Sequence, residues 1–394
     1  MSNSWTESLP RCPLSGCGYS QNGVYAGAFT RHDHEFIHEC LNIDFNGVRF
    51  YGLFCGYNGE KKAAQFVADR LAYEIFYADN PLLETYDDEM EKFLTDRMLL
   101  KEQDSLGDTT VNVRIAELNA KLRTGTTALV ALIIGEYMYI INCGNSRALL
   151  LLHTPDGRDF DCRELNFPHD NDNNDEIRRI EELGVDPTMV HRPTRAIGDF
   201  FRQKNYHENP ELYSAKGPPV ISVPEIFAYE VEEDCGHIIL VSDAVITMLE
   251  EIGIDPQQIN EHLMELIQRE FSHGTSASCT SISQAVIDSL LRDHRERFIT
   301  GETAGVYNRH GDLSLMIISF RKQDATKFTM TNTMSLEEPQ EDSLSLPVDA
   351  YVDLVDFDSQ PQHDAVLART RQIFGFDITE PISSTQNSIE EERL

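Results

Sequence analysis

The sequence feature that most constrains the fold is a two-residue connection between two β-forming runs. Residues 127–134 and 137–142 are rich in β-branched and aromatic side chains, and only Gly135-Glu136 separates them. Two residues are enough for a tight antiparallel hairpin, whereas a parallel pair needs a crossover of about a dozen residues or more. The chain is therefore expected to contain an antiparallel sheet, and a doubly wound parallel fold is excluded.

The rest of the first 322 residues extends this pattern. Short apolar runs predict further strands at residues 48–54, 148–153, 236–241 and 314–320. Helical periodicity predicts helices at residues 61–76, 87–100, 112–122, 256–271 and 281–298. Because the helices come in groups and the strands pair through hairpins, we expect an α+β fold with antiparallel sheets.

The composition changes near residue 322 and indicates how the chain is divided. The segment that follows is rich in Thr, Ser, Met, Glu and Pro and has no amphipathic period, which is typical of a linker. We expect an N-terminal segment at 1–19, a globular domain at 20–322, a flexible linker at 323–347, a separate segment at 348–376, to which the resemblance described below assigns docking on a kinase, and an acidic disordered tail at 377–394.

The charge balance disfavours two classes of partner. Asp and Glu number 66 against 33 Lys and Arg, a net charge of −33. Such a surface repels nucleic acids and anionic membranes. The N-terminus has no signal-peptide pattern, and the richest apolar stretch, residues 127–141, is too short to span a bilayer. Eight cysteines without a disulfide-like spacing indicate reduced thiols, so we expect a cytoplasmic protein.

Residues 31–40 resemble a metal-ligand cluster. They contain His32, His34 and His38, and the last two would share one face of a helix. A zinc site of this kind needs a fourth ligand at a defined spacing, and none stands out. We therefore interpret the segment as a polar loop.

Residues 170–175, with Glu181 in the twelfth place, resemble a calcium-binding loop. The sixth position of such a loop requires glycine, and here it is Asp175. A helix over residues 175–183 with Asp175 as its N-cap fits the segment better.

A series of segments in order resembles the motifs of the metal-dependent type 2C (PPM) Ser/Thr protein phosphatases. Asn142-Cys143-Gly144-Asn145-Ser146-Arg147-Ala148 resembles Asn-Val-Gly-Asp-Ser-Arg-Ala, and Arg195-Ala196-Ile197-Gly198-Asp199-Phe200 resembles Arg-Ala-Leu-Gly-Asp-Phe. The other similar segments are residues 50–59, 124–128, 224–226 and 239–244. The resemblance implies a sandwich of two antiparallel sheets flanked by helices, with two divalent metal ions at one edge.

The carboxylates that this family needs are largely replaced here. Its bridging Asp aligns with Cys55, followed by Gly56, and two further metal ligands align with Pro168 and Gly311. Asp243 is retained, and Asp312 stands one residue out of register. Because Mg²⁺ and Mn²⁺ prefer oxygen ligands, the resemblance implies a degenerate site: no bound metal, no cofactor and no catalytic residues.

The resemblance extends to a branch of the family that binds a TGF-β-activated MAP kinase kinase kinase. The start Ser4-Trp5-Thr6-Glu7-Ser8-Leu9-Pro10 and a late aromatic segment carry it. The late segment contains the expected kinase-binding residues Tyr351, Val352, Asp353, Leu354 and Phe357. This implies a non-catalytic adaptor that binds and activates such a kinase. One alternative is an active metal-dependent phosphatase that uses Asp243 and Asp312, and another is a domain that binds phosphoproteins without cleaving them.

Overall fold

The computed structural model describes residues 25–31, 38–45, 48–58, 62–77, 92, 94–101, 109–153, 160–231, 235–273, 278–300 and 312–320. The segments expected at residues 1–19, 323–347, 348–376 and 377–394 lie outside these residues.

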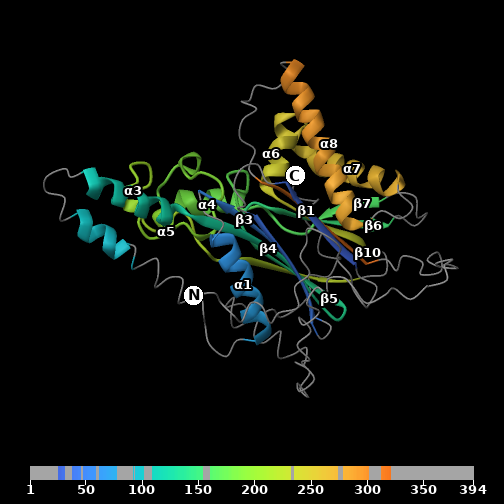
Figure 1. Ribbon diagram of the computed structural model, residues 1–394, viewed down its shortest axis with the longest axis horizontal. Coiled ribbons are helices and arrows are strands. Elements are labelled where there is room, and N and C mark those ends of the chain that lie inside the picture. The colour runs from blue at the N-terminus through green and yellow to red at the C-terminus, as the bar shows by residue number, and fades with distance from the viewer. Residues whose placement is uncertain are drawn as a thin grey trace, which may run out of the picture.

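Two antiparallel sheets face each other and form a sandwich (Figure 1). The first sheet contains, in spatial order, β1 (Tyr25–Arg31), β11 (Leu313–Ser319), β10 (Cys235–Val241), β6 (Arg147–His153) and β7 (Phe160–Glu164). The second contains β2 (His38–Phe45), β3 (Val48–Tyr57), β4 (Gly125–Ile134), β5 (Tyr137–Cys143) and β9 (Glu225–Glu230), with β8 (Ile197–Gly198) paired to the start of β4. The α+β sandwich expected from the sequence is confirmed.

Helices cover the outer faces of both sheets (Figure 1). On the first sheet lie α6 (Asp243–Glu251), α7 (Ile259–His273) and α8 (Cys279–Thr300). On the second lies α1 (Lys62–Tyr77), while α3 (Thr109–Arg123) contacts the short α5 (Phe200–Gln203), and α4 (Asn174–Glu182) belongs to the segment between β7 and β9. No helix in the described ranges is both long and apolar enough to cross a membrane.

Strand β4 is central because it supplies side chains to two cores. All ten of its residues are buried. Leu129, Ala131 and Ile133 point between the sheets, where they join side chains of β10 and β11. The alternate side chains of β4 pack against α1 instead, as the two-residue period of a strand requires. The predicted β4–β5 hairpin is confirmed, and Gly135 occupies its turn with φ +61°.

Two interpretations from the sequence are corrected. The segment 31–40 is not a polar loop throughout, because Arg31 ends β1 and His38 to Cys40 begin β2. The helix predicted at 175–183 exists as α4, but its N-cap is Asn173, whose side chain accepts a hydrogen bond from the backbone N–H of Asp175. Every member of this Asn/Asp run can cap a helix, so the type of residue alone does not select one.

Gly144 lies at the turn between β5 and β6 and allows a close approach of two strands. Its φ is +147°, and a Cβ there would lie 2.3 Å from the Cβ of Thr127. We expect Gly144→Ala to lower the free energy of unfolding by about 3 kcal/mol, since overpacking and backbone strain act together. Chemical denaturation measures this loss.

The matched control is Gly135→Ala. That glycine also has positive φ, but a Cβ there would meet nothing within 4 Å. Only the backbone cost of about 1 kcal/mol is expected for it. Equal losses in the two variants would contradict the close-packing explanation.

Candidate functional site

A cavity of about 720 Å³ opens at one end of the sandwich. The end of β3, the start of α6 and loops around residues 191–193, 199–202 and 208–210 line it. Three arginines, Arg123, Arg192 and Arg202, contribute to the lining. Of the six positions expected from the sequence at a degenerate metal site, the structure brings Cys55, Gly56 and Asp243 to this cavity.

Cys55 is a buried, neutral group at the end of β3. Its backbone pairs with His38 of β2 on one side and Thr127 of β4 on the other. Its Sγ lies 3.6 Å from the hydroxyl of Ser146. Burial raises the pKa of the thiol to about 12, although the contact with Ser146 acts in the opposite direction. At neutral pH this position therefore presents a protonated thiol, which is a poor ligand for a hard cation.

Asp243 is the carboxylate at the start of α6, directly after β10. Burial raises the pKa of its carboxyl to about 6, while nearby Arg192 acts to lower it. The preceding Ser242 does not cap the helix with its side chain, because its hydroxyl accepts a hydrogen bond from the backbone N–H of Ser314. This bond joins the residue between β10 and α6 to β11, the neighbour of β10 in the first sheet.

Asp312 is buried next to the start of β2 rather than placed in the cavity lining. Its Oδ2 accepts the backbone N–H of His38 at 3.2 Å. The His38 ring in turn lies 2.8 Å from the Ser314 hydroxyl through Nδ1, and Thr30 contacts the same hydroxyl at 2.9 Å. These hydrogen bonds connect β1, β2 and β11.

Of the two remaining positions, the structure describes only Pro168, which does not belong to the cavity lining. Pro168 is half-buried, and its carbonyl accepts a hydrogen bond from the side chain of Asn173 at 2.9 Å. Gly311 lies outside the described residues, as do Tyr351, Val352, Asp353, Leu354 and Phe357. Within the ranges that the structure describes, no three His, Cys, Asp or Glu side chains are arranged to hold a metal ion.

Tyr57, two residues after Cys55, forms part of a cluster that sequence reasoning missed. Its hydroxyl donates to Asp199 Oδ2 at 3.1 Å and accepts from Arg202 Nη2 at 3.2 Å, while Arg202 also pairs with Asp199. Burial raises the pKa of Tyr57 well above its ordinary value, so the phenol stays neutral. Asp199 has φ +50°, a left-handed conformation that orients its carboxylate. The sequence signals were two family-like segments, residues 50–59 with Tyr57 and residues 195–200 with Asp199, but nothing in the sequence indicated that they meet.

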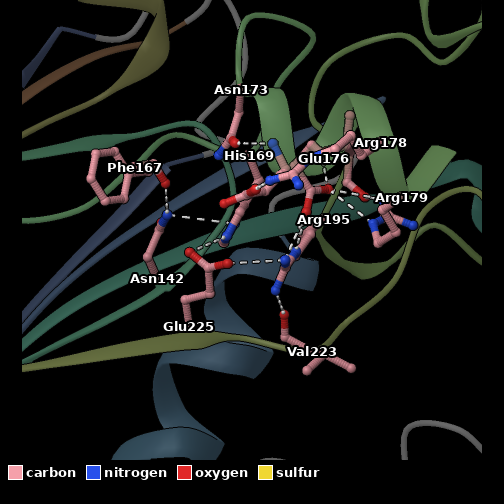
Figure 2. A network of polar contacts seen from close by, with 12 residues as sticks. Asn142, Phe167, His169, Asn173, Glu176, Arg178, Arg179, Arg195, Val223 and Glu225 are labelled. Carbon is pink, nitrogen blue, oxygen red and sulfur yellow. Dashed lines mark hydrogen bonds and ion pairs between the residues drawn. The ribbon is translucent and has the colours of Figure 1, made fainter. Parts of the chain in front are cut away.

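Glu176 is a fully buried carboxylate at the centre of a polar network (Figure 2). It accepts hydrogen bonds from Arg179 at 2.8 Å, Thr194 at 2.6 Å and Arg195 at 2.8 Å. Burial alone would raise the pKa of this carboxyl, but these donors hold it at about 2. Glu176 therefore stays ionised and fastens α4 to the loop that carries Thr194 and Arg195.

His169 extends the same network to the sheet (Figure 2). Its Nδ1 accepts the backbone N–H of Gly144 at 3.0 Å, which leaves the ring proton on Nε2. Nε2 faces Glu225 of β9 at 3.2 Å, and Glu225 also pairs with Arg195 at 3.0 Å. The hydrogen bond from His169 keeps the pKa of Glu225 below its usual value. One chain of contacts thus joins β5, β9 and α4.

We expect Glu176→Gln to lower the free energy of unfolding at pH 7 by about 3 kcal/mol, which is the lowering of the pKa from 4.5 to about 2 expressed as energy. Because the pKa of Glu176 is lower in the folded state, its carboxylate stabilises the fold at pH values above the pKa of the unfolded state. This stabilisation is lost as the pH falls through the pKa of the folded state. The difference between the variant and the parent should therefore narrow from about pH 4.5 toward pH 2. Urea titrations at several pH values measure it.

The exposed Glu182 of the same helix provides the control as Glu182→Gln. This variant should unfold like the parent at every pH, since surface charges contribute little. A loss for Glu176→Gln that is independent of pH would contradict the ionised-carboxylate explanation.

Comparison with known proteins places this arrangement in a family. Residues 49–295 match protein phosphatase 2C. The chain is 31% identical over 357 residues to a Caenorhabditis elegans protein named "TGF-beta-activated kinase 1 and MAP3K7-binding protein 1", with 84% of this chain and 88% of the relative covered.

Two further similarities are more distant. "Probable protein phosphatase 2C 54" of Oryza sativa subsp. japonica is 27% identical over 61% of this chain and 63% of its own length. The crystal structure of a serine-threonine phosphatase 2C from Toxoplasma gondii is 16% identical, with a TM-score of 0.47 over 79% of this chain and 98% of that one. The family match spans more than half of the chain and includes β3 to α8, so the protein belongs to the protein phosphatase 2C family.

Proposed function

We propose that this protein is a non-catalytic adaptor that binds and activates a MAP kinase kinase kinase of the TGF-β-activated type. Its phosphatase-like domain then serves as a folded platform and does not hydrolyse phosphoesters. The single observation that supports the loss of catalysis is the buried Cys55 thiol with its Ser146 contact, at the position that the sequence resemblance aligns with a carboxylate bridging two metal ions.

The other candidate ligands support the same proposal. Asp312 accepts the backbone N–H of His38 and does not line the cavity among the described residues, and Pro168 offers no side-chain oxygen. Asp243 is a single carboxylate, and its burial disfavours the ionised form. Two hard divalent ions need several anionic oxygens, so the described residues do not fit a binuclear Mg²⁺ or Mn²⁺ centre.

The kinase partner is proposed from the relatives and from the late sequence. The Caenorhabditis elegans relative is named for binding a kinase of this type, and the chain covers 88% of it. The segment Tyr351-Val352-Asp353-Leu354-Val355-Asp356-Phe357 combines apolar anchors with acidic residues. Such a segment suits an amphipathic helix that binds in an apolar groove of the kinase, while residues 323–347 serve as a linker.

The full-length protein is expected to release no phosphate from phosphoserine or phosphothreonine peptides in millimolar Mn²⁺ or Mg²⁺. The reason is that a thiol at position 55, where the resemblance implies a bridging carboxylate, is a poor ligand for the ions that activate water. Phosphate release measured against buffer tests this. Metal-dependent turnover that Asp243→Ala removes would instead support an active phosphatase with an altered site.

The double variant Tyr351→Ala, Phe357→Ala is expected to lose binding to the kinase catalytic domain. Aromatic anchors typically cost about 2 kcal/mol or more each when truncated, so affinity should fall at least tenfold. Isothermal titration calorimetry with the purified kinase domain measures the affinity. The melting temperature of the adaptor should not change.

The control is Tyr213→Ala, which removes a 63% exposed aromatic side chain from the folded domain. It should leave kinase affinity unchanged. If the double variant binds at full strength, the kinase-binding site lies on the folded domain and the docking role of residues 348–376 is wrong.

A further inference from the structure

Strand β9 (Glu225–Glu230) lies at one end of the second sheet, and among the described strands it pairs only with β5. The backbone N–H of Val231 donates to Glu136 at 2.7 Å in the same register. Hydrogen-bonded positions alternate along an antiparallel pair, so Phe227 and Tyr229 bond to β5. The backbone N–H and C=O groups of Ile226, Ala228 and Glu230 then point to the open side of the sheet.

The middle of this edge lacks the features that usually prevent strand addition. Exposed edge strands normally carry lysines, prolines or inward charges that block another strand. Pro224 precedes β9, and its two acids are the terminal residues Glu225 and Glu230. The four residues between them are uncharged, and three of these are only half-buried.

Two apolar side chains lie beside the edge and are held in place. Phe167 is 60% exposed and Val223 is 48% exposed. The ring of Phe167 packs edge-to-face on Phe227 of β9, with centroids 6.0 Å apart. The side chain of Asn142 fixes the backbone of this residue by donating to the Phe167 carbonyl at 3.0 Å (Figure 2). A fixed, exposed aromatic ring next to an open strand edge is typical of an anchor site.

The charge of the candidate segments decides which of them could pair with β9 as an additional strand. A second copy pairing antiparallel through the whole of β9 would place Glu225 opposite Glu230, and each chain carries a net charge of −33. The tail of the chain is also acidic, with Glu390, Glu391 and Glu392 near its end. Like charges opposite each other destabilise a strand pair. The exposed Glu230 and Glu136 at the end of this edge favour a basic partner.

We propose that the β9 edge binds an extended segment of another protein, with alternating apolar and basic residues, as an additional strand of the second sheet. Backbone hydrogen bonds to Ile226, Ala228 and Glu230 hold the segment, and its apolar side chains contact Phe167 and Val223. This surface is separate from the cavity that contains Cys55 and Asp243.

A matched pair of variants of the full chain tests the backbone contacts. Glu230→Pro removes the backbone N–H that points away from β5. An edge strand tolerates this change because that N–H makes no hydrogen bond to β5. Glu230→Ala removes the same charge and keeps the N–H. The probe is a fluorescent peptide of alternating valine and lysine, and anisotropy gives its affinity. We expect Glu230→Pro to bind at least fivefold more weakly than Glu230→Ala. Equal affinities of these two variants would overturn strand addition.

A second measurement separates strand addition from nonspecific attraction of a basic peptide. The same peptide with alternate backbone amides N-methylated keeps its charge and loses its inter-strand hydrogen bonds. It should not bind, and the unmodified peptide should slow amide hydrogen exchange at Ile226, Ala228 and Glu230. Full binding of the N-methylated peptide would overturn the proposal.

The anchor is tested with Phe167→Ala against Ile299→Ala, which truncates a 71% exposed side chain at the end of α8. Only the first should weaken binding, by about tenfold. A dimer in sedimentation that Phe167→Ala dissociates would show a second copy at this edge and overturn the proposal of a foreign strand.

Discussion

The arrangement around the cavity depends on one buried charged group. Glu176 is fully buried, and its ionised carboxylate is acceptable only while Arg179, Thr194 and Arg195 all donate to it. Removing one partner from such a group costs several kcal/mol, because the remaining charge stays buried. The loop that carries Thr194 and Arg195 is therefore held in one position relative to α4, the helix that carries Glu176 and Arg179. This loop directly follows residues 191–193, which form part of the cavity rim.

The cavity end of the sandwich is organised on a different principle. Besides the Arg202–Asp199 ion pair, the contacts there join the Cys55 thiol with the Ser146 hydroxyl, the Ser242 hydroxyl with the Ser314 backbone, and the Ser314 hydroxyl with the His38 ring. Each such bond contributes roughly 1 kcal/mol and needs no counter-ion. These bonds join the end of β3 to the turn before β6, and they join the end of β10 and the start of β2 to β11.

How far the sequence predicts this structure depends on the range of the interactions. The β4–β5 hairpin and the long α8 were predictable, because their signals lie within a few residues of each other. Strand β9 was missed, since its six residues become a strand only beside β5. The alignment of Cys55 and Asp243 came from family motifs, and the structure supplies their burial and partners. The network around Glu176 was not predicted, because only Arg179 lies nearby in the sequence and the other two donors follow 18 and 19 residues later along the chain.

Tyr57 has a consequence for how this chain can change during evolution. A Cβ at Gly125 would lie 2.6 Å from the Tyr57 hydroxyl, and that hydroxyl is also bonded to Asp199 and Arg202. An acid placed at position 55 would replace a buried thiol, two residues from Tyr57 and within the electrostatic influence of Asp243. Introducing a carboxylate at position 55 is thus unfavourable while its neighbours stay unchanged. A single substitution at that position therefore does not readily produce a metal ligand.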